Sequence, residues 1–220
     1  MCSSDLLPPG QTVIRWMTNS QPAFGAIGPV HVDPRTGEIL DAQIALESLS
    51  SRAIRTARSQ ILSAASLATA PSPSALAEAQ ACAHAEQAYE QLNLGLQWLG
   101  LQHGTDGAPL DPDAPEVQAF VLAYLRDTTM HEVGHTLGLR HNFRASRWHS
   151  AAELQDPVLT RTQGNSASVM DYAPINLPPP GQTGGEPFQA VLGPYDYWAI
   201  AYGYTPLPAD AQAAATQLKQ

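Results

Sequence analysis

The sequence predicts an α+β protein, with strands near its N-terminus, helices after them and an irregular C-terminal part. Residues 13–17 and 23–47 are rich in β-branched and aromatic side chains, which is typical of strands. From about residue 48 the apolar residues recur at helical spacing. Proline becomes frequent after residue 170, which favours loops. Strands and helices in separate blocks are characteristic of the α+β class.

Three strands are expected at the N-terminal end. The first is Val13–Met17, and the second spans Ala23–Val32, where two glycines loosen it. Asp33-Pro34-Arg35-Thr36-Gly37 has turn chemistry, because proline presets φ, glycine closes the turn and aspartate bonds its own backbone. Glu38–Glu47 follows as the third strand, so residues 23–47 should form a hairpin or a closely related strand pair.

Helical periodicity then appears in two segments before the main motif. One helix is expected from Ser48 to about Leu67, followed by a break at Pro71–Ser74. A second, alanine-rich helix is expected from Ala75 to about Gln91. Residues 92–101 either extend that helix or pack as a separate turn.

A long helix is expected over about residues 114–137. Asp113 is suited to be its N-cap, with Glu116 three residues on as the capping-box partner. One helical face is traced by Val117, Phe120, Val121, Tyr124, Thr128, His131 and His135. The apolar first half should bury this helix, and its last two turns should present the two histidines.

Shorter elements are expected after residue 141. Ser150 and Glu153 have the spacing of a capping box for a short helix. Gly193-Pro194-Tyr195-Asp196 begins a final helix, and Gly203 is placed to end it.

Composition argues against two classes of partner. The chain has 220 residues and a net charge of −9, without a cluster of lysines and arginines, so nucleic acids and anionic membrane surfaces are not expected partners. No apolar run approaches the roughly 20 residues of a membrane-spanning helix. The cysteines, Cys2 and Cys82, neither require nor exclude an oxidising compartment. We expect Cys82 to be a small buried hydrophobe, and the oligomeric state stays open.

The segment His131-Glu132-Val133-Gly134-His135-Thr136-Leu137-Gly138-Leu139-Arg140-His141 predicts a catalytic zinc site. On a helix, His131 and His135 lie on one face, with Glu132 at the border of the same site. Gly138 falls where the helix should end, so the chain can turn and return His141 as a third nitrogen ligand. Three protein ligands leave the fourth tetrahedral position for water. A structural zinc site would not need Glu132 and usually recruits cysteine.

A second motif, Ser168-Val169-Met170-Asp171-Tyr172, lies downstream. Together the two motifs resemble the metzincin clan of zinc metallopeptidases, which pairs HExxHxxGxxH with a Met-turn. Within the clan, three further segments resemble a bacterial group of zinc-dependent metalloproteases: Asp33 to Ile39, His141-Asn142-Phe143, and Tyr195-Asp196 leading to residues 201–204. The resemblance covers most of the chain from about residue 13, but little of 50–112. Asn142 departs from several better-known families, so the chain is not assigned to those.

The resemblance implies a role for each matching residue. Three histidines would bind Zn²⁺: His131, His135 and His141. Glu132 would be the general base and acid, and Gly138 the turn glycine. Met170 would lie beneath the zinc as a hydrophobic floor. Tyr172, at the position of a tyrosine in astacins and serralysins, would reach the metal or the developing oxyanion; the alternative is a buried core tyrosine.

The clan also implies an architecture for residues 1–220 as one catalytic domain. An upper lobe, residues 7–141, would hold a twisted mixed sheet and long helices. A small, mostly irregular lower lobe, residues 142–220, would hold the Met-turn at 168–172 and a C-terminal helix. The strand around Asp41–Glu47 would be the edge strand that binds substrate, the alternative being an inner strand. Residues near Tyr172-Ala173-Pro174 and the middle of the active-site helix should line the pocket beside the zinc.

The implied function is a zinc-dependent endopeptidase acting on peptides or proteins in an extracellular, periplasmic or cell-envelope location. One alternative is an inactive peptidase used as a zinc-binding or adhesion module, against which the intact Glu132 argues. Another is a zinc amidohydrolase acting on a non-protein amide. Residues 1–6 resemble a translated sequencing-adapter end, so we expect the chain to be a fragment.

Overall fold

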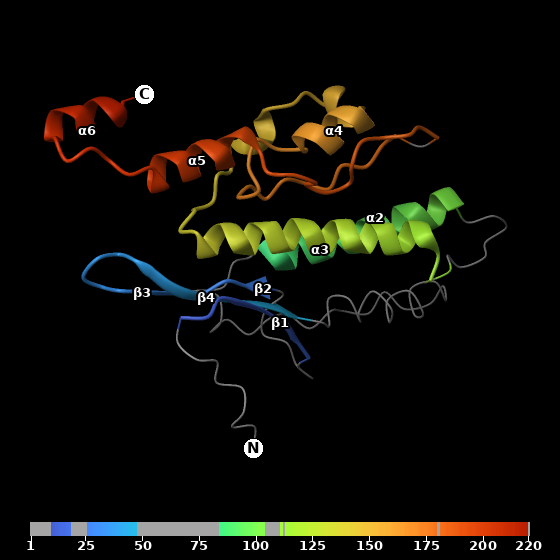
Figure 1. The fold of residues 1–220 in the computed structure, drawn as a ribbon. Helices are drawn as coiled ribbons and strands as arrows, with labels where there is room; N and C mark the ends of the chain where they lie inside the picture. The colour runs from blue at the N-terminus through green and yellow to red at the C-terminus, as the bar shows by residue number, and fades with distance from the viewer. Residues whose placement is uncertain are drawn as a thin grey trace, which may run out of the picture.

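The computed structural model describes residues 10–18, 26–47, 84–103, 111, 113–179 and 181–219. The fold is α+β, as predicted, with a mixed four-stranded sheet. Figure 1 shows the sheet on one side of the long helix α3 (Pro115–Thr136) and the C-terminal segment on the other. The helix expected over 48–67, the break at 71–74 and Cys82 lie outside the described residues.

The sheet is built around its longest strand. Strand β4 (Ile39–Glu47) pairs in parallel with β1 (Val13–Met17), whose bounds are those predicted. On its other side β4 pairs antiparallel with β2 (Ala26–Ile27) and then β3 (Val30–Val32), so the predicted hairpin is confirmed. The turn before β4 is also confirmed, because an Asp33 side-chain oxygen accepts from Arg35 N at 2.9 Å and Gly37 has a φ of 76°.

The expectation that residues 41–47 form the edge strand is wrong. These residues belong to β4, which is hydrogen-bonded on both sides and is therefore an inner strand. The outer strand formed by β2 and β3 is the outermost on its side of the sheet among the described residues. It is interrupted at Gly28–Pro29, where proline has no N–H to donate. The Pro29 carbonyl still accepts from Gln43 N at 3.0 Å, which keeps this strand attached across the gap.

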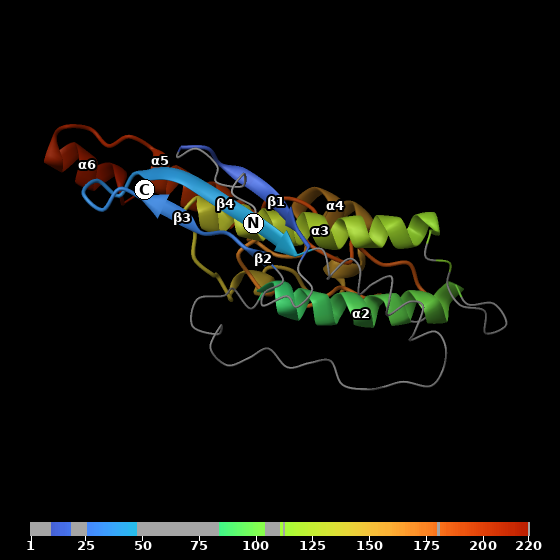
Figure 2. The same ribbon diagram turned by 90° about the horizontal axis from the view of Figure 1, so that it is seen from below.

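Two long helices form the second layer. Helix α2 (His84–His103) continues through residues 92–101, so that segment extends the predicted helix. Figures 1 and 2 show α2 and α3 side by side and antiparallel. Their shared core contains the buried residues Leu92, Leu96, Leu99, Val117, Phe120, Tyr124 and Phe188. Phe188 comes from the C-terminal segment, and its ring lies 5.2 Å from that of Phe120, so this core joins that segment to the helices.

The first residue of helix α3 and its N-cap both lie one residue later than predicted. Its N-cap is Ala114, not Asp113, and no side chain caps it. Proline is favoured at the first helical position, where its missing N–H costs nothing, and Pro115 therefore fixes the start. The helix ends at Thr136, with Leu137 as its C-cap.

The C-terminal part contains short helices linked by irregular chain. These are η1 (Ala145–Arg147), η2 (Glu153–Gln155), α4 (Pro157–Gln163), α5 (Pro194–Tyr204) and α6 (Ala211–Gln217). The reciprocal bonds between Ser150 and Glu153 confirm the capping box. The prediction that Gly203 ends the last helix is wrong: α5 continues to Tyr204, just before Pro206, and α6 follows it. Among the described helices, none combines the length and apolar character needed to cross a bilayer.

Candidate metal centre and active site

The end of α3 brings three histidines together. His131 and His135 are one turn apart, with ring centroids 4.8 Å apart. Gly138 takes a φ of 80°, the left-handed conformation that ends helices, and Leu139 N donates to Gly134 O at 3.0 Å. After this turn His141 returns toward the helix, and its Nε2 lies 3.0 Å from Nε2 of His135. One nitrogen from each ring lies within 4.8 Å of the others.

Backbone carbonyls orient two of these rings. His131 Nδ1 lies 2.7 Å from Val169 O, and His135 Nδ1 lies 3.1 Å from Leu139 O. A carbonyl oxygen can only accept a hydrogen bond, so each Nδ1 carries the hydrogen and each Nε2 keeps its lone pair. This tautomer is the one that metal-binding histidines adopt when Nε2 is the ligand atom.

The second motif lies directly against the helix. Met170 is fully buried, and its Sδ would be 2.3 Å from a Cβ added at Gly134. Only glycine at this position lets the methionine approach so closely. Asn142 N donates to Met170 O at 2.9 Å, which joins the residue after the third histidine to the turn below. Met170 therefore lies under the stretch of helix between His131 and His135.

These two motifs, in this order and in contact, agree with the comparison with protein families. Residues 113–220 match the model of a family described as Met-zincin. Residues 113–220 belong to the Met-zincins. No curated protein and no solved structure matches the chain. The Met-zincin segment begins at the N-terminus of α3 and includes the three histidines, the Met-turn and the short C-terminal helices.

Glu132 lies between the first two histidines of the Met-zincin motif and is fully buried. Neither of its carboxylate oxygens has a hydrogen-bond partner in the described structure. Burial raises the pKa of Glu132 to about 7. A Cβ added at Gly28, between β2 and β3, would lie 3.3 Å from Glu132 Oε2, so the outer strand closely borders this carboxylate. Such a group is poised to accept a proton near neutral pH.

Tyr172 lies at the other side of the cluster. It is half-buried, and its hydroxyl oxygen lies 3.2 Å from His141 Nε2. The ring centroids of these two residues are 4.8 Å apart. The tyrosine thus stands beside the third histidine, outside the apolar core between α2 and α3.

The chemistry of the three histidines fits a zinc ion, and the spacing of one pair is close to what the ion needs. Tetrahedral zinc with Zn–N distances of about 2.0–2.1 Å separates its nitrogen ligands by roughly 3.3 Å. The 3.0 Å between the Nε2 atoms of His135 and His141 is close to that separation. Burial lowers the pKa of both residues, and for His141 the neighbouring His135 lowers it further, which favours the neutral, metal-binding form.

Asp196 supports the site, although the sequence marked it only as part of a predicted helix start. It is buried near the start of α5 and accepts from Ser168 Oγ at 2.6 Å, Val169 N at 3.0 Å and Gly193 N at 2.8 Å. Asp196 therefore holds the irregular segment before Met170, including Val169, whose carbonyl orients His131. The sequence offered a signal only for the local contact, because an aspartate at the third position of a helix can cap its own N-terminus, as Asp196 does at Gly193 N.

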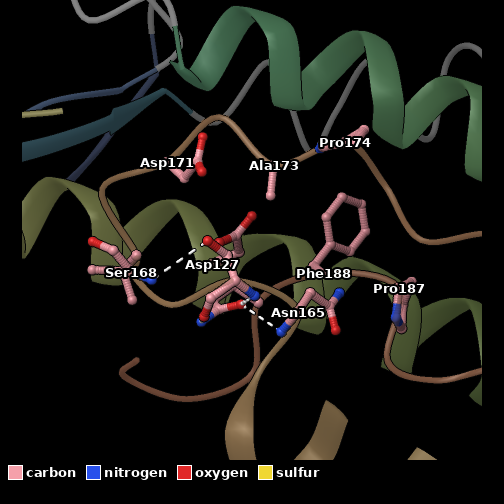
Figure 3. Close-up of a pocket in the computed structure, with 11 residues that line it drawn as sticks. Asp127, Asn165, Ser168, Asp171, Ala173, Pro174, Pro187 and Phe188 are labelled. Carbon is pink, nitrogen blue, oxygen red and sulfur yellow. Dashed lines mark hydrogen bonds between the residues drawn. The ribbon is translucent and has the colours of Figure 1, made fainter. Parts of the chain in front are cut away.

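A small cavity lies on the far side of α3 from the sheet. It has a volume of about 10 Å³, close to the space one water molecule needs. Asp127, one turn before His131, lines it together with Ala173 and Pro174, as Figure 3 shows. None of the three histidines lines this cavity, so it is not the predicted pocket beside the zinc, and that pocket stays a prediction. Burial raises the pKa of Asp127 to about 7.

A larger groove lies at the other end of α3. It measures about 640 Å³ and runs between α2, the segment from Glu116 to Ala123 and residues 176–187. Those α3 residues precede His131 by 8 to 15 positions, which is roughly 12–22 Å along the helix. None of the three histidines lines it, so this groove is separate from the histidine cluster.

Proposed function

We propose that this Met-zincin is a zinc-dependent endopeptidase with Glu132 as its general base. The position of Glu132 supports the proposal most: a buried carboxylate without a hydrogen-bond partner stands on the helix between two histidines that converge with a third. A histidine cluster that served only to hold a structural metal would have no need of this costly buried carboxylate.

In the proposed reaction His131, His135 and His141 hold the metal. When bound, zinc supplies a water molecule with a pKa near 7 and polarises the substrate carbonyl. Glu132 takes a proton from the attacking water and passes it to the leaving amine. Tyr172, beside His141, donates a hydrogen bond to the oxygen on which negative charge develops.

The substrate would lie along the outer strand formed by β2 and β3. Gly28, in the gap between β2 and β3, borders Glu132, and these two strands are the outermost of the described sheet on that side. An extended peptide can add to such an edge through main-chain hydrogen bonds. This placement would bring a peptide bond alongside the metal centre.

The decisive variant is Glu132→Gln, which keeps the side-chain shape but removes the base. We expect zinc content to stay at the wild-type level while cleavage of casein and of a quenched mixed-peptide library falls by about 10²–10⁴-fold. Glu116→Gln, on the exposed face of the same helix, is the matched control and should cleave normally. Wild-type cleavage by the Glu132 variant, with zinc bound and chelator-sensitive, would rule out the proposed mechanism.

Tyr172→Phe tests the second proposed catalytic group. We expect zinc content to be unchanged and kcat to fall, because one hydrogen bond to the developing oxyanion is lost. An unchanged kcat would leave Tyr172 as a packing partner of His141. If the wild-type chain cleaved small non-protein amides but no peptide, the substrate class proposed here would be wrong.

We also propose that the protein belongs to a bacterial zinc-dependent metalloprotease group and works outside the cytoplasm. The support is the resemblance of the motifs to that group. Fractionation of cells that express the gene tests the location, and recovery of the protein with the cytoplasmic fraction would contradict it.

A further inference from the structure

Phe143 is an aromatic residue of the motif His141-Asn142-Phe143 that the proposed chemistry does not use. Its ring centroid lies 5.3 Å from that of His141 and 5.0 Å from that of Tyr172. The ring meets Tyr172 at an interplanar angle of 86°, an edge-to-face packing that aromatic pairs favour. Phe143 therefore stands directly beside the third histidine and the proposed oxyanion donor.

The ring is exposed in spite of these contacts. Phe143 leaves 62% of its surface accessible, a large apolar area next to the proposed metal centre. Exposed apolar surface that adjoins a reactive centre is typical of a ligand-contacting position.

The backbone around Phe143 is held in place on both sides. Asn142 N donates to Met170 O at 2.9 Å, and Ala145 N donates to Asn142 O at 3.1 Å. Asn142 Oδ1 accepts from Arg144 N at 3.3 Å, which closes a short turn around Phe143. Ala145 itself is buried. The ring is thus presented from a fixed turn, which limits the entropy lost when a ligand packs on it.

We propose that Phe143 is a substrate-contacting residue that makes the site prefer peptides with an aromatic or large aliphatic side chain next to the bond to be cleaved. Phe143 and Tyr172 together offer an aromatic surface against which an apolar side chain loses its contact with water. An acidic side chain gains nothing from these rings and would give up its hydration. This inference rests on the proposed peptidase function, because it assigns a substrate class to the same site.

The test measures binding separately from cleavage. The zinc-loaded full chain carrying Glu132→Ala is immobilised, a random peptide library is passed over it, and the retained peptides are sequenced. We expect phenylalanine, tyrosine, leucine and methionine to be enriched over aspartate and glutamate. Adding Phe143→Ala should reduce that enrichment about tenfold, whereas Phe143→Leu, which keeps an apolar surface, should preserve most of it.

Tyr197→Ala is the matched control. Tyr197 is 64% exposed, much like Phe143, but lies on α5, so the enrichment should not change. In the active chain, Phe143→Ala should raise KM for apolar peptides more than it lowers kcat. The proposal is overturned if the enrichment survives Phe143→Ala, if basic residues are the ones enriched, or if no peptide is retained.

The two proposals fail in different ways. Peptide retention that depends on Phe143, without cleavage by the wild-type chain, would refute the peptidase function but support the role of Phe143. Cleavage with a side-chain preference that Phe143→Ala leaves unchanged would refute the role of Phe143 alone.

Discussion

Replacing Gly134 with alanine should destabilise the protein, because Met170 occupies the space the new methyl group needs. The added Cβ would lie 2.3 Å from Met170 Sδ, more than 1 Å closer than ordinary carbon contacts of about 3.5–4.0 Å. Met170 is fully buried, so its side chain has no open space to rotate into. Inserting a methyl group into such packing typically costs about 1–3 kcal/mol.

The gain in helix propensity works in the opposite direction and needs a control. Alanine is favoured over glycine within a helix by up to about 1 kcal/mol, so the measured change for Gly134→Ala mixes both effects. Gly100→Ala in α2 gains the propensity without a clash, since no atom lies within 4 Å of its added Cβ. The difference between the two variants therefore isolates the overpacking, and we expect about 1–3 kcal/mol.

Urea denaturation of the metal-free protein, in the presence of a chelator, measures both free energies of unfolding without a contribution from bound metal. A second measurement uses Met170→Ala, which should cost less in the Gly134→Ala background than alone, because it removes the atom that clashes. Equal stability of the Gly134→Ala and Gly100→Ala variants would show that Met170 does not lie against the helix as described.

Three further predictions concern residues around the site. Gly28→Ala places a Cβ 2.8 Å from Glu132 O and should lower kcat about tenfold or more while zinc is retained. The control Gly203→Ala, whose added Cβ has no atom within 4 Å, should keep the wild-type kcat, and equal kcat values for the two variants would contradict the packing of the outer strand on α3. Asp196→Asn should lower the free energy of unfolding, measured by urea denaturation, by about 1–3 kcal/mol and weaken zinc affinity, because one amide oxygen cannot satisfy three donors. Wild-type values for both quantities would refute the anchoring role of Asp196. Because burial raises the pKa of Asp127 to about 7, the free energy of unfolding should fall by up to about 4 kcal/mol as pH rises from about 4 through 7. Asp127→Asn should flatten that fall in the metal-free protein, and an unchanged pH profile would show that the carboxyl is hydrated.

The sequence was most informative where local spacing determines geometry. The helical interval between His131 and His135 and the glycine at 138 were enough to predict that three rings would converge. Turn chemistry likewise placed the turn before β4, and β-branched residues gave the bounds of β1.

Features that depend on distant partners were missed. The number of strands flanking residues 41–47 is set by pairing, so their own pattern of side chains did not distinguish an inner from an edge strand. Asp196 contacts residues 27 and 28 positions earlier in the chain, which no local motif encodes. The start of α3 was missed for a local reason: two cap signals were adjacent, and the proline at 115 prevailed over the aspartate at 113.

The hydrogen bond from His131 to Val169 O has a consequence for biosynthesis. Its two partners are 38 residues apart, and the carboxylate that fixes Val169 follows 27 residues later still. During translation, α3 is therefore made well before the carbonyl that orients His131. A nascent chain that ends before Asp196 has all three imidazoles but lacks the anchor for the carbonyl that orients His131. The carbonyl that orients His131 is thus anchored only after the first turn of α5 has been synthesised.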